Sequence, residues 1–377
     1  MNEYFAYGFL SAIHLMAGFH GLFLAAILYF NKRFHSKSSQ FLAMAIFAMS
    51  IIVCYDFFYY SVEEEELPLI IQYLPIYIRT AIPIGLYFFI RYLIDPNSQL
   101  KGWERLWYLP IVIEVILELL YIPINLFLTE DTIATGEHLL LILEESMGLF
   151  TSIPLLWLAI RKINSYQNFL LDNYSNLSGK SLLWLRNLVM VILLIFTVWL
   201  FNHLLFIIGL ESEGTYSVVS FGLIGILFWM GYFVILQHPL FQAPQFTATK
   251  TSATTPKKLS PKTDSYHQSL IHLMESESLY NNPELNLQNL ANTLNISPGY
   301  LSQIINEKEH KNFFEFINHY RVEEAKRKLM SPKYDHYSIM GIAMESGFNS
   351  KSTFNALFKK FTGHTPSSFK KMHQVQD

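Results

Sequence analysis

Two short stretches in the C-terminal third of the sequence carry hydrogen-bonding and basic side chains at helical spacing. Such side chains suit the recognition of nucleic acid, because amides and hydroxyls read base edges while lysines hold phosphates. In each stretch, apolar residues three and four positions apart mark an inward face, so the polar residues between them must point outward. The residues that we expect to contact DNA are Ser297, Gly299, Tyr300, Gln303 and Asn306 in the first stretch, and Ser350, Lys351, Ser352, Asn355, Lys359 and Lys360 in the second.

The two stretches differ in charge. The outward residues of the first include no lysine or arginine, so it would read bases through amide and hydroxyl groups. The second is rich in lysine, and no acidic residue occurs from 346 to 376. Because the 12 Lys and Arg of residues 264–377 balance its 12 Asp and Glu, these lysines form a local phosphate-binding patch on a neutral domain. An ordinary solvated face is the alternative, and the repeat around the lysines favours binding.

Both stretches belong to a repeat with an offset of 52 residues, which runs from Leu290 to Leu301 and again from Ile342 to Phe354. The spacing matches up to the turn, after which the second copy is one residue longer. Asn295 and Gly347 stand at the turn and are of the types that best tolerate a left-handed backbone. Ser297 follows as an N-cap. Helix, tight turn and capped helix make up the helix-turn-helix motif.

A third helical segment must position the two copies. Residues 313–330 have helical periodicity and end before Pro332. Eighteen residues form a helix of about 27 Å, which could hold the two recognition helices near the ~34 Å of one DNA turn. A leading helix is predicted at about 265–279, followed by Pro283.

The region from about residue 265 to residue 373 resembles the DNA-binding domain of the AraC/XylS family of bacterial regulators. The resemblance runs through LANTLNISPGYLSQIIN, FFEFINHYRVEEAKRKL and IAMESGFNSKSTFNALFKKFTGHTPSSFKK. It implies a reader of double-stranded promoter DNA with two motifs, of which the second often anchors to the DNA backbone and faces RNA polymerase. Many family members carry a soluble sugar-binding barrel at the N-terminus. Apolar spans stand in its place here, so sugar binding and barrel-mediated dimerisation do not carry over.

The N-terminal part of the sequence has a different character. Of the 27 Lys and Arg residues, only 11 lie in residues 1–241, among long apolar runs. A helix needs about 20 mostly apolar residues to cross a bilayer, and seven such stretches occur in adjacent succession. The seven predicted spans are roughly 4–30, 40–60, 69–94, 106–128, 138–160, 182–208 and 216–237.

The loops between the spans predict the orientation. The loops after spans one, three and five carry basic residues, whereas those after spans two, four and six carry acidic residues and no Lys or Arg. The positive-inside rule therefore places the N-terminus outside and the C-terminus in the cytoplasm. We expect a multi-pass protein of the bacterial inner membrane. The predicted architecture is all-α, a seven-helix transmembrane bundle followed by the AraC-type double helix-turn-helix domain.

The domain limits follow from composition. Residues 1–241 form the membrane domain, 242–263 a linker and 264–377 the DNA-binding domain. The linker is rich in Thr, Ser, Pro and Lys and has no acidic residue, which predicts a flexible tether with an r.m.s. span of about 25 Å. Its lysines would contact anionic lipid headgroups or simply be solvated.

Ionisable residues inside the predicted spans are candidates for sensing a signal, because charge is costly within a bilayer. One interpretation is an outward-facing polar pocket in which Arg79 meets an anionic ligand. The other is that Arg79 pairs with a carboxylate and holds the bundle together. The candidate pocket comprises Arg79, Glu114, Glu118, Glu144, Glu145 and His203.

No catalytic motif occurs, and we expect neither an enzyme nor a cofactor. Cys54 is the only cysteine, and no His lies at helical spacing beside Glu114 and Glu118, so we expect no metal site. The favoured function is a one-component transcription regulator whose membrane bundle senses an unknown small-molecule or membrane signal. The bundle would act by shifting its conformation or by forming a homodimer. The alternative is a transporter or receptor in which the helix-turn-helix domain has a secondary role.

Overall fold

The computed structural model describes residues 2–34, 36–61, 78–127, 130–208, 210, 213–236 and 262–374. All regular structure in these ranges is helical, and only an isolated antiparallel bridge joins Tyr174 to Asn286. The all-α class is therefore confirmed. Most of the predicted linker, residues 242–261, lies outside the described residues.

The chain divides into two compact units. Unit 1 comprises Met1–Asn164 and Leu182–Phe246, and unit 2 comprises Ser165–Ser181 and Thr247–Asp377. A 17-residue segment, made of the end of one apolar helix and the loop that follows it, thus packs with the C-terminal part of the chain, although the sequence pattern placed it in the membrane domain. Each unit is described separately below.

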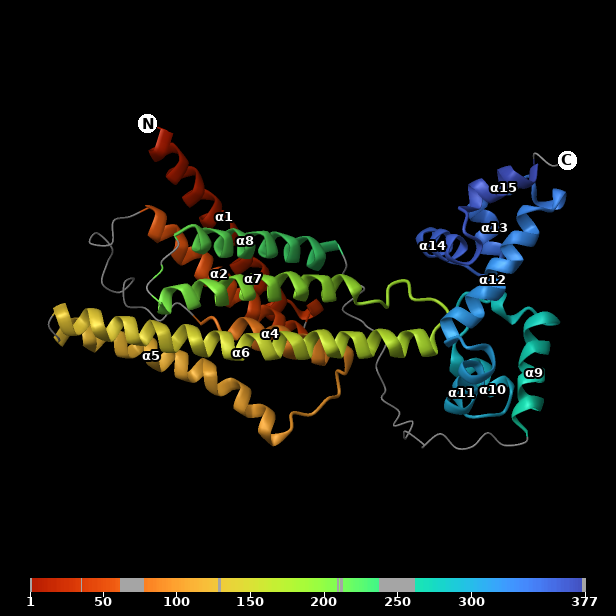
Figure 1. The fold of residues 1–377 in the computed structure, drawn as a ribbon, viewed down its shortest axis with the longest axis horizontal. Helices are drawn as coiled ribbons and strands as arrows, with labels where there is room; N and C mark the ends of the chain where they lie inside the picture. Colours follow the sequence, from red (N-terminus) through yellow and green to blue (C-terminus); the bar gives the residue numbers. More distant parts are fainter. Residues whose placement is uncertain are drawn as a thin grey trace. The chain divides into compact units, whose positions relative to one another are not determined.

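Unit 1 is a set of long apolar helices (Figure 1). The helix α6 begins in unit 1 and ends in unit 2, and two 3₁₀ helices, η1 (Lys32–Phe34) and η3 (Gly102–Tyr108), lie in loops. The helices that contribute to unit 1 are α1 (Asn2–Phe30), α2 (Lys37–Ser61), α4 (Ala81–Ile94), α5 (Leu109–Phe127), α6 (Glu130–Asn173), α7 (Leu183–Ile207) and α8 (Glu213–Leu236).

Among the described residues, four helices are long and apolar enough to cross a membrane, namely Phe9–Phe30, Lys37–Phe57, Ile142–Asn173 and Leu183–Ile207. Two shorter apolar helices, Ala81–Ile94 and Val219–Phe233, match the described parts of predicted spans three and seven. The start of span three, at residues 69–77, lies outside the described residues. Predicted span four coincides with α5. The number seven stays a prediction.

The outer surface of unit 1 is apolar where a soluble protein would be polar. Phe150 is 82% exposed, Phe23 69% and Leu194 63%. Inside the unit, glycines allow helices to cross closely: a Cβ on Gly85 of α4 would lie 2.8 Å from the Phe41 carbonyl oxygen of α2. Small residues at crossings and large apolar residues outside are typical of helices packed in lipid.

Unit 2 consists of short helices arranged around one longer helix. Figure 1 shows α12 passing between two groups, α9–α11 on one side and α13–α15 on the other. The helices are α9 (Thr263–Glu275), α10 (Leu287–Thr293), α11 (Pro298–Glu309), α12 (Phe313–Leu329), α13 (Ile339–Glu345), α14 (Lys351–Thr362) and α15 (Pro366–Gln374), with 3₁₀ turns η5 (Leu279–Asn281) and η6 (Pro332–Tyr334).

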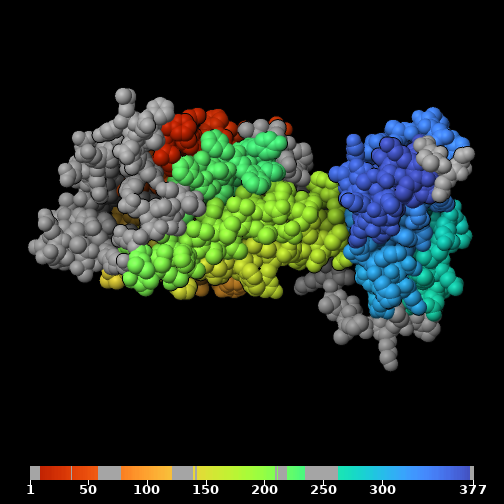
Figure 2. All heavy atoms as spheres, turned by 45° about the horizontal axis from the view of Figure 1, so that its top comes forward, coloured from red at the N-terminus to blue at the C-terminus, as the bar shows by residue number. Residues whose placement is uncertain are grey.

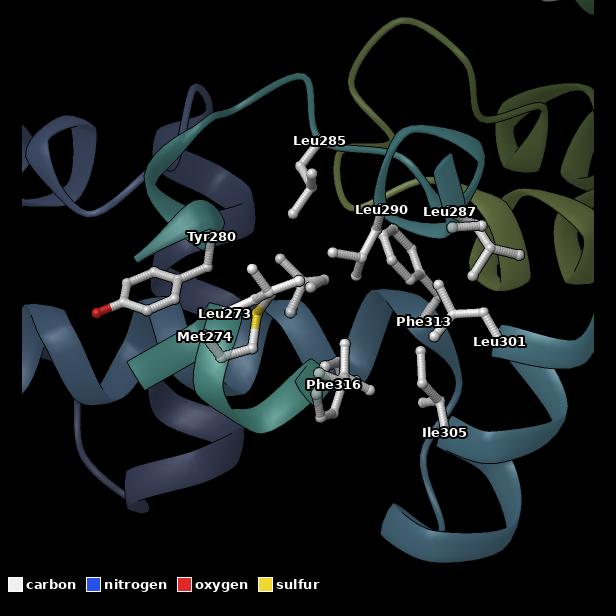
Figure 3. Close-up of a cluster of buried hydrophobic side chains, with 13 residues drawn as sticks. Leu273, Met274, Tyr280, Leu285, Leu287, Leu290, Leu301, Ile305, Phe313 and Phe316 are labelled. Carbon is white, nitrogen blue, oxygen red and sulfur yellow. The ribbon is translucent and has the colours of Figure 1, made fainter. Parts of the chain in front are cut away.

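The helix α12 contributes to two separate hydrophobic cores. Phe313, Phe316 and Ile317 pack into the first core, with side chains from α9, α10 and α11 (Figure 3). Val322 and Leu329 pack into the second, with side chains from α13, α14 and α15. Because this one helix is shared by both cores, it joins the two groups as predicted for residues 313–330, and it is called the strut below. The leading helix is shorter than predicted and ends at Glu275.

Candidate nucleic-acid interface

The turns of the two repeated segments have the same backbone geometry. Asn295 has φ 53° and Gly347 has φ 85°, so both adopt the left-handed conformation expected from their types. In the first copy the Ile296 amide donates to the Ala291 carbonyl at 3.0 Å, and in the second the Phe348 amide donates to the Ala343 carbonyl at 3.0 Å. This bond spanning six residues is typical of a Schellman turn. The sequence repeat is therefore a structural repeat.

The second helix of each copy begins with a serine cap. The Ser297 hydroxyl accepts a hydrogen bond from the Tyr300 amide at 3.3 Å, and Pro298 takes the first helical position. The Ser350 hydroxyl accepts one from the Thr353 amide at 3.4 Å. Both serines thus hold the start of the helix that would enter the major groove.

The inward face of α11 matches the prediction, since Leu301, Ile304 and Ile305 are fully buried. On the other face Asn306 is exposed, whereas Gly299, Tyr300 and Gln303 are half-buried. The Tyr300 hydroxyl lies 2.8 Å from the Thr263 hydroxyl of α9, and the Gln303 amide donates to Glu307 at 2.8 Å. These side chains must leave intramolecular partners to contact a base.

The face of α14 is more open. Phe354, Leu357 and Phe358 are buried. Lys360 pairs with Glu315 of α12 at 2.7 Å, whereas Lys351 and Lys359 take part in no ion pair among the described residues. The second motif occupies the dark blue surface in Figure 2. The predicted contact residues exposed on α14 are Lys351, Ser352, Asn355, Lys359 and Lys360.

The space around the second turn is fully occupied. A Cβ on Gly347 would lie 2.4 Å from the Tyr280 carbonyl oxygen and 2.9 Å from Nε of Arg321. Arg321, in α12, is only 1% exposed and is the largest fully buried side chain among the described residues. Sequence reasoning missed this residue, because an arginine in a mixed helix is ordinarily taken as a surface charge.

In unit 1, four of the six candidate pocket residues lie together. Glu114 of α5 accepts hydrogen bonds from the Arg79 amide at 2.8 Å and the Thr80 amide at 3.0 Å, just before α4. The Arg79 guanidinium lies 3.7 Å from the Glu144 carboxylate. The Glu118 carboxyl is close enough to that of Glu144 to interact with it electrostatically. A cluster of three carboxyl groups around one arginine therefore joins α4, α5 and α6.

The other two candidates form a separate pair. Nδ1 of His203 lies 2.7 Å from the Glu145 carboxylate, and Nε2 lies 3.0 Å from the Ser146 hydroxyl. This pair joins α7 to α6. No group of three or more His, Cys, Asp or Glu side chains placed to hold a metal ion occurs among the residues that the structure describes.

Comparison with known proteins identifies the C-terminal region. Residues 290–372 match the family described as helix-turn-helix domain. An uncharacterized HTH-type transcriptional regulator of Staphylococcus aureus strain COL is 29% identical over 116 residues, which are 29% of this chain and 15% of that protein. The uncharacterized HTH-type regulator YijO of Escherichia coli is 33% identical over 92 residues, covering 24% and 31% of the two chains.

A third relative is the uncharacterized transcriptional regulatory protein YesN of Bacillus subtilis, 35% identical over 92 residues and 24% of each chain. This chain therefore spans less than a third of the length of these curated relatives. A solved structure of a protein of unknown function from Listeria innocua is 30% identical, with 29% of this chain and 97% of that chain covered and a TM-score of 0.26.

Proposed function

We propose that this chain, whose C-terminal region is an AraC-type helix-turn-helix domain, is a membrane-bound, sequence-specific transcription regulator. Its membrane bundle would sense a signal, and its cytoplasmic domain would bind promoter DNA. The observation that carries the proposal is the pair of equivalent turns at Asn295 and Gly347, each followed by a capped helix with polar residues outward.

Two recognition helices connected by one strut suit a single DNA duplex. Because α12 joins the two cores, α11 and α14 belong to one unit and could enter successive major grooves. The exposed lysines of α14 suit phosphates, and Asn306 suits a base edge. The second motif would therefore anchor the domain and the first would supply more of the reading. RNA polymerase is a further partner implied by the resemblance to the AraC/XylS family.

Membrane attachment is supported by the four apolar helices of membrane-spanning length and by the exposed aromatic and aliphatic side chains of unit 1. In our topology the N-terminus is outside, with seven spans and the loop between α6 and α7 in the cytoplasm. The packing of residues 165–181 within the C-terminal unit supports a cytoplasmic position for the loop between α6 and α7. A DNA-binding domain must occupy the same compartment.

The cluster around Arg79 is our candidate for the signal-sensing site. Arg79, just before α4, lies beside carboxylates of α5 and α6. A ligand or a proton that binds one arrangement of these groups better than another would shift the bundle toward it. Glu145 and His203 form a second polar contact, which such a change would have to keep or break.

The proposal is tested by mapping the genomic sites that the intact, membrane-embedded protein occupies, followed by binding of the recovered promoter fragment to the full chain in nanodiscs. We expect affinity to fall steeply with salt, and to fall further in a Lys351→Gln, Lys359→Gln double variant. Lys333→Gln, which removes an exposed lysine from η6, is the matched control and should bind normally. Absence of salt-dependent binding by the unsubstituted chain would refute the proposal.

A further inference from the structure

The loop that follows α6 is built into the DNA-binding unit. Ser175 is 1% exposed and Asn176 is 7% exposed. The Ser175 amide and hydroxyl both donate to the Leu285 carbonyl, at 3.4 Å and 2.5 Å. Tyr174 forms the antiparallel bridge with Asn286. In Figure 3 this yellow-green loop passes beside the segment that carries Leu285 and Leu287.

Arg321 contributes two of the hydrogen bonds that hold the loop. A guanidinium has five N–H donors, and Arg321 uses its three nitrogens for five hydrogen bonds. Three go to unit 2 beyond the loop, namely to the carbonyls of Tyr280 at 2.7 Å and Asn282 at 2.8 Å and to the Asn318 side chain at 3.2 Å. The other two go to the Ser175 carbonyl at 3.1 Å and the Ser175 hydroxyl at 3.0 Å.

A buried cation is stable only when its donors are satisfied. Burial lowers the pKa of Arg321 to about 10, so the side chain stays charged near neutral pH. Without the loop, two donors of this charge would lose their acceptors, and Asn318 would lose its 2.9 Å bond to the Ser175 carbonyl. The site is therefore shaped for a backbone carbonyl and a hydroxyl presented together.

The loop contacts both helix-turn-helix motifs. Ser175 and Tyr174 meet the start of the first motif at Leu285 and Asn286. Leu171 and Leu177 pack against the hydrophobic core of the second motif. Lys180 adds an ion pair to Glu284 at 3.8 Å. Residues 171–180, called the docking segment below, thus lie against both motifs and against the strut that joins them.

We propose that the docking segment is the element through which the membrane bundle controls the DNA-binding domain, by holding its two motifs in the arrangement that binds DNA. The inference rests on the proposed function. The segment continues α6, which also carries Glu144 and Glu145, so a change in the bundle has a continuous helix to act through. With the segment docked, the contact lysines of α14 and Asn306 of α11 remain exposed.

Preorganisation is the physical basis of the proposed direction. Two recognition helices held at a fixed separation lose less freedom on binding than two that must be aligned by the DNA. Withdrawal of the segment would expose the buried charge of Arg321 to water and loosen the contact between the motifs. DNA affinity would then fall without any change in the recognition side chains.

The first test locks the segment in place. Tyr174 and Asn286 are bridge partners, and such pairs lie within disulfide range. The full chain with Cys54→Ser, Tyr174→Cys and Asn286→Cys is oxidised in membranes. We expect rapid intramolecular cross-linking, and slow cross-linking when Asn306→Cys replaces Asn286→Cys. If the two cysteine pairs cross-linked at equal rates, the segment would not be docked at Asn286, whatever the result of the DNA-binding test.

The second test measures affinity for the promoter fragment recovered by the occupancy mapping. We expect the oxidised pair to bind at least as tightly as its own reduced form, which controls for the substitutions. Ser175→Lys, which sets a second cation against Arg321, should bind about tenfold more weakly, whereas Ser178→Lys at an exposed position should bind normally. Weaker binding by the oxidised form, or equal binding by the two lysine variants, would overturn the inference. Failure of every form, including the unsubstituted chain, would instead refute the proposed function.

Discussion

The two helix-turn-helix motifs share one backbone design but differ in how they are embedded and in what they present. Each has a left-handed turn residue, a Schellman bond and a serine cap. The first turn is exposed at Asn295, whereas the second is buried at Gly347 against Tyr280 and Arg321. The difference shows that the motifs are not interchangeable. The turn of the second motif is the one that lies against Arg321.

The largest expected effect separates the two turns directly. Gly347→Ala places a Cβ 2.4 Å from a backbone oxygen at a φ of 85°, so we expect a loss of about 3 kcal/mol or more in the stability of unit 2. Asn295→Ala, at an exposed turn, should cost about 1 kcal/mol. Pulse proteolysis of the full chain measures both. Equal losses would show that the second turn is not more constrained than the first.

The next largest effect, the loss of stability when a buried alanine is enlarged, should be the same in both motifs. Ala291 and Ala343 are each fully buried where two helices cross. Ala291→Leu and Ala343→Leu should each destabilise unit 2 by roughly 1–3 kcal/mol through overpacking. Hydrogen exchange would locate the loss, in α9–α11 for the first variant and in α13–α15 for the second. A loss confined to the other core would contradict the division into two cores.

Base reading and phosphate binding should separate in the recognition helices. Asn306→Ala should cost about 1–3 kcal/mol of discrimination at one base position and leave the salt dependence unchanged. Lys359→Gln should weaken binding to all sequences and lower the slope of log affinity against log salt by about 0.9. Titrations of the promoter fragment and its point variants at several salt concentrations distinguish them. The assignment fails if the two variants exchange these signatures.

The smallest effect concerns the caps. Ser297 and Ser350 accept equivalent bonds from the amide three residues onward. Ser297→Ala and Ser350→Ala should each destabilise unit 2 by about 1 kcal/mol. Replacement by aspartate at either position should restore the stability and weaken DNA binding, because the added charge faces phosphates. Urea-dependent proteolysis and salt titration measure the two effects. Full DNA affinity in the aspartate variants would place these serines away from the DNA.

Local sequence patterns were sufficient for the features that depend on near neighbours. The faces of α11 and α14, the turns at Asn295 and Gly347 and the strut α12 were all predicted, because helical periodicity, caps and left-handed residues act within a few positions. The apolar helices were predicted for the same reason, since a span is a continuous run. For the candidate pocket, the sequence predicted only which ionisable residues lie within the apolar spans. It did not predict which of them contact one another.

The tertiary structure decided the features that join distant residues. It divided the candidate pocket into a cluster around Arg79 and a separate Glu145–His203 pair, and it tied Tyr300 to Thr263. It also brought Ser175 to Arg321, which lies 146 residues further along the chain. Such contacts leave no local pattern, because they join residues that are far apart in the sequence. The charge of Arg321 needs its partners only because folding buries it. The sequence by itself determined the repeated motif, and folding alone placed the loop after α6 against both of its copies.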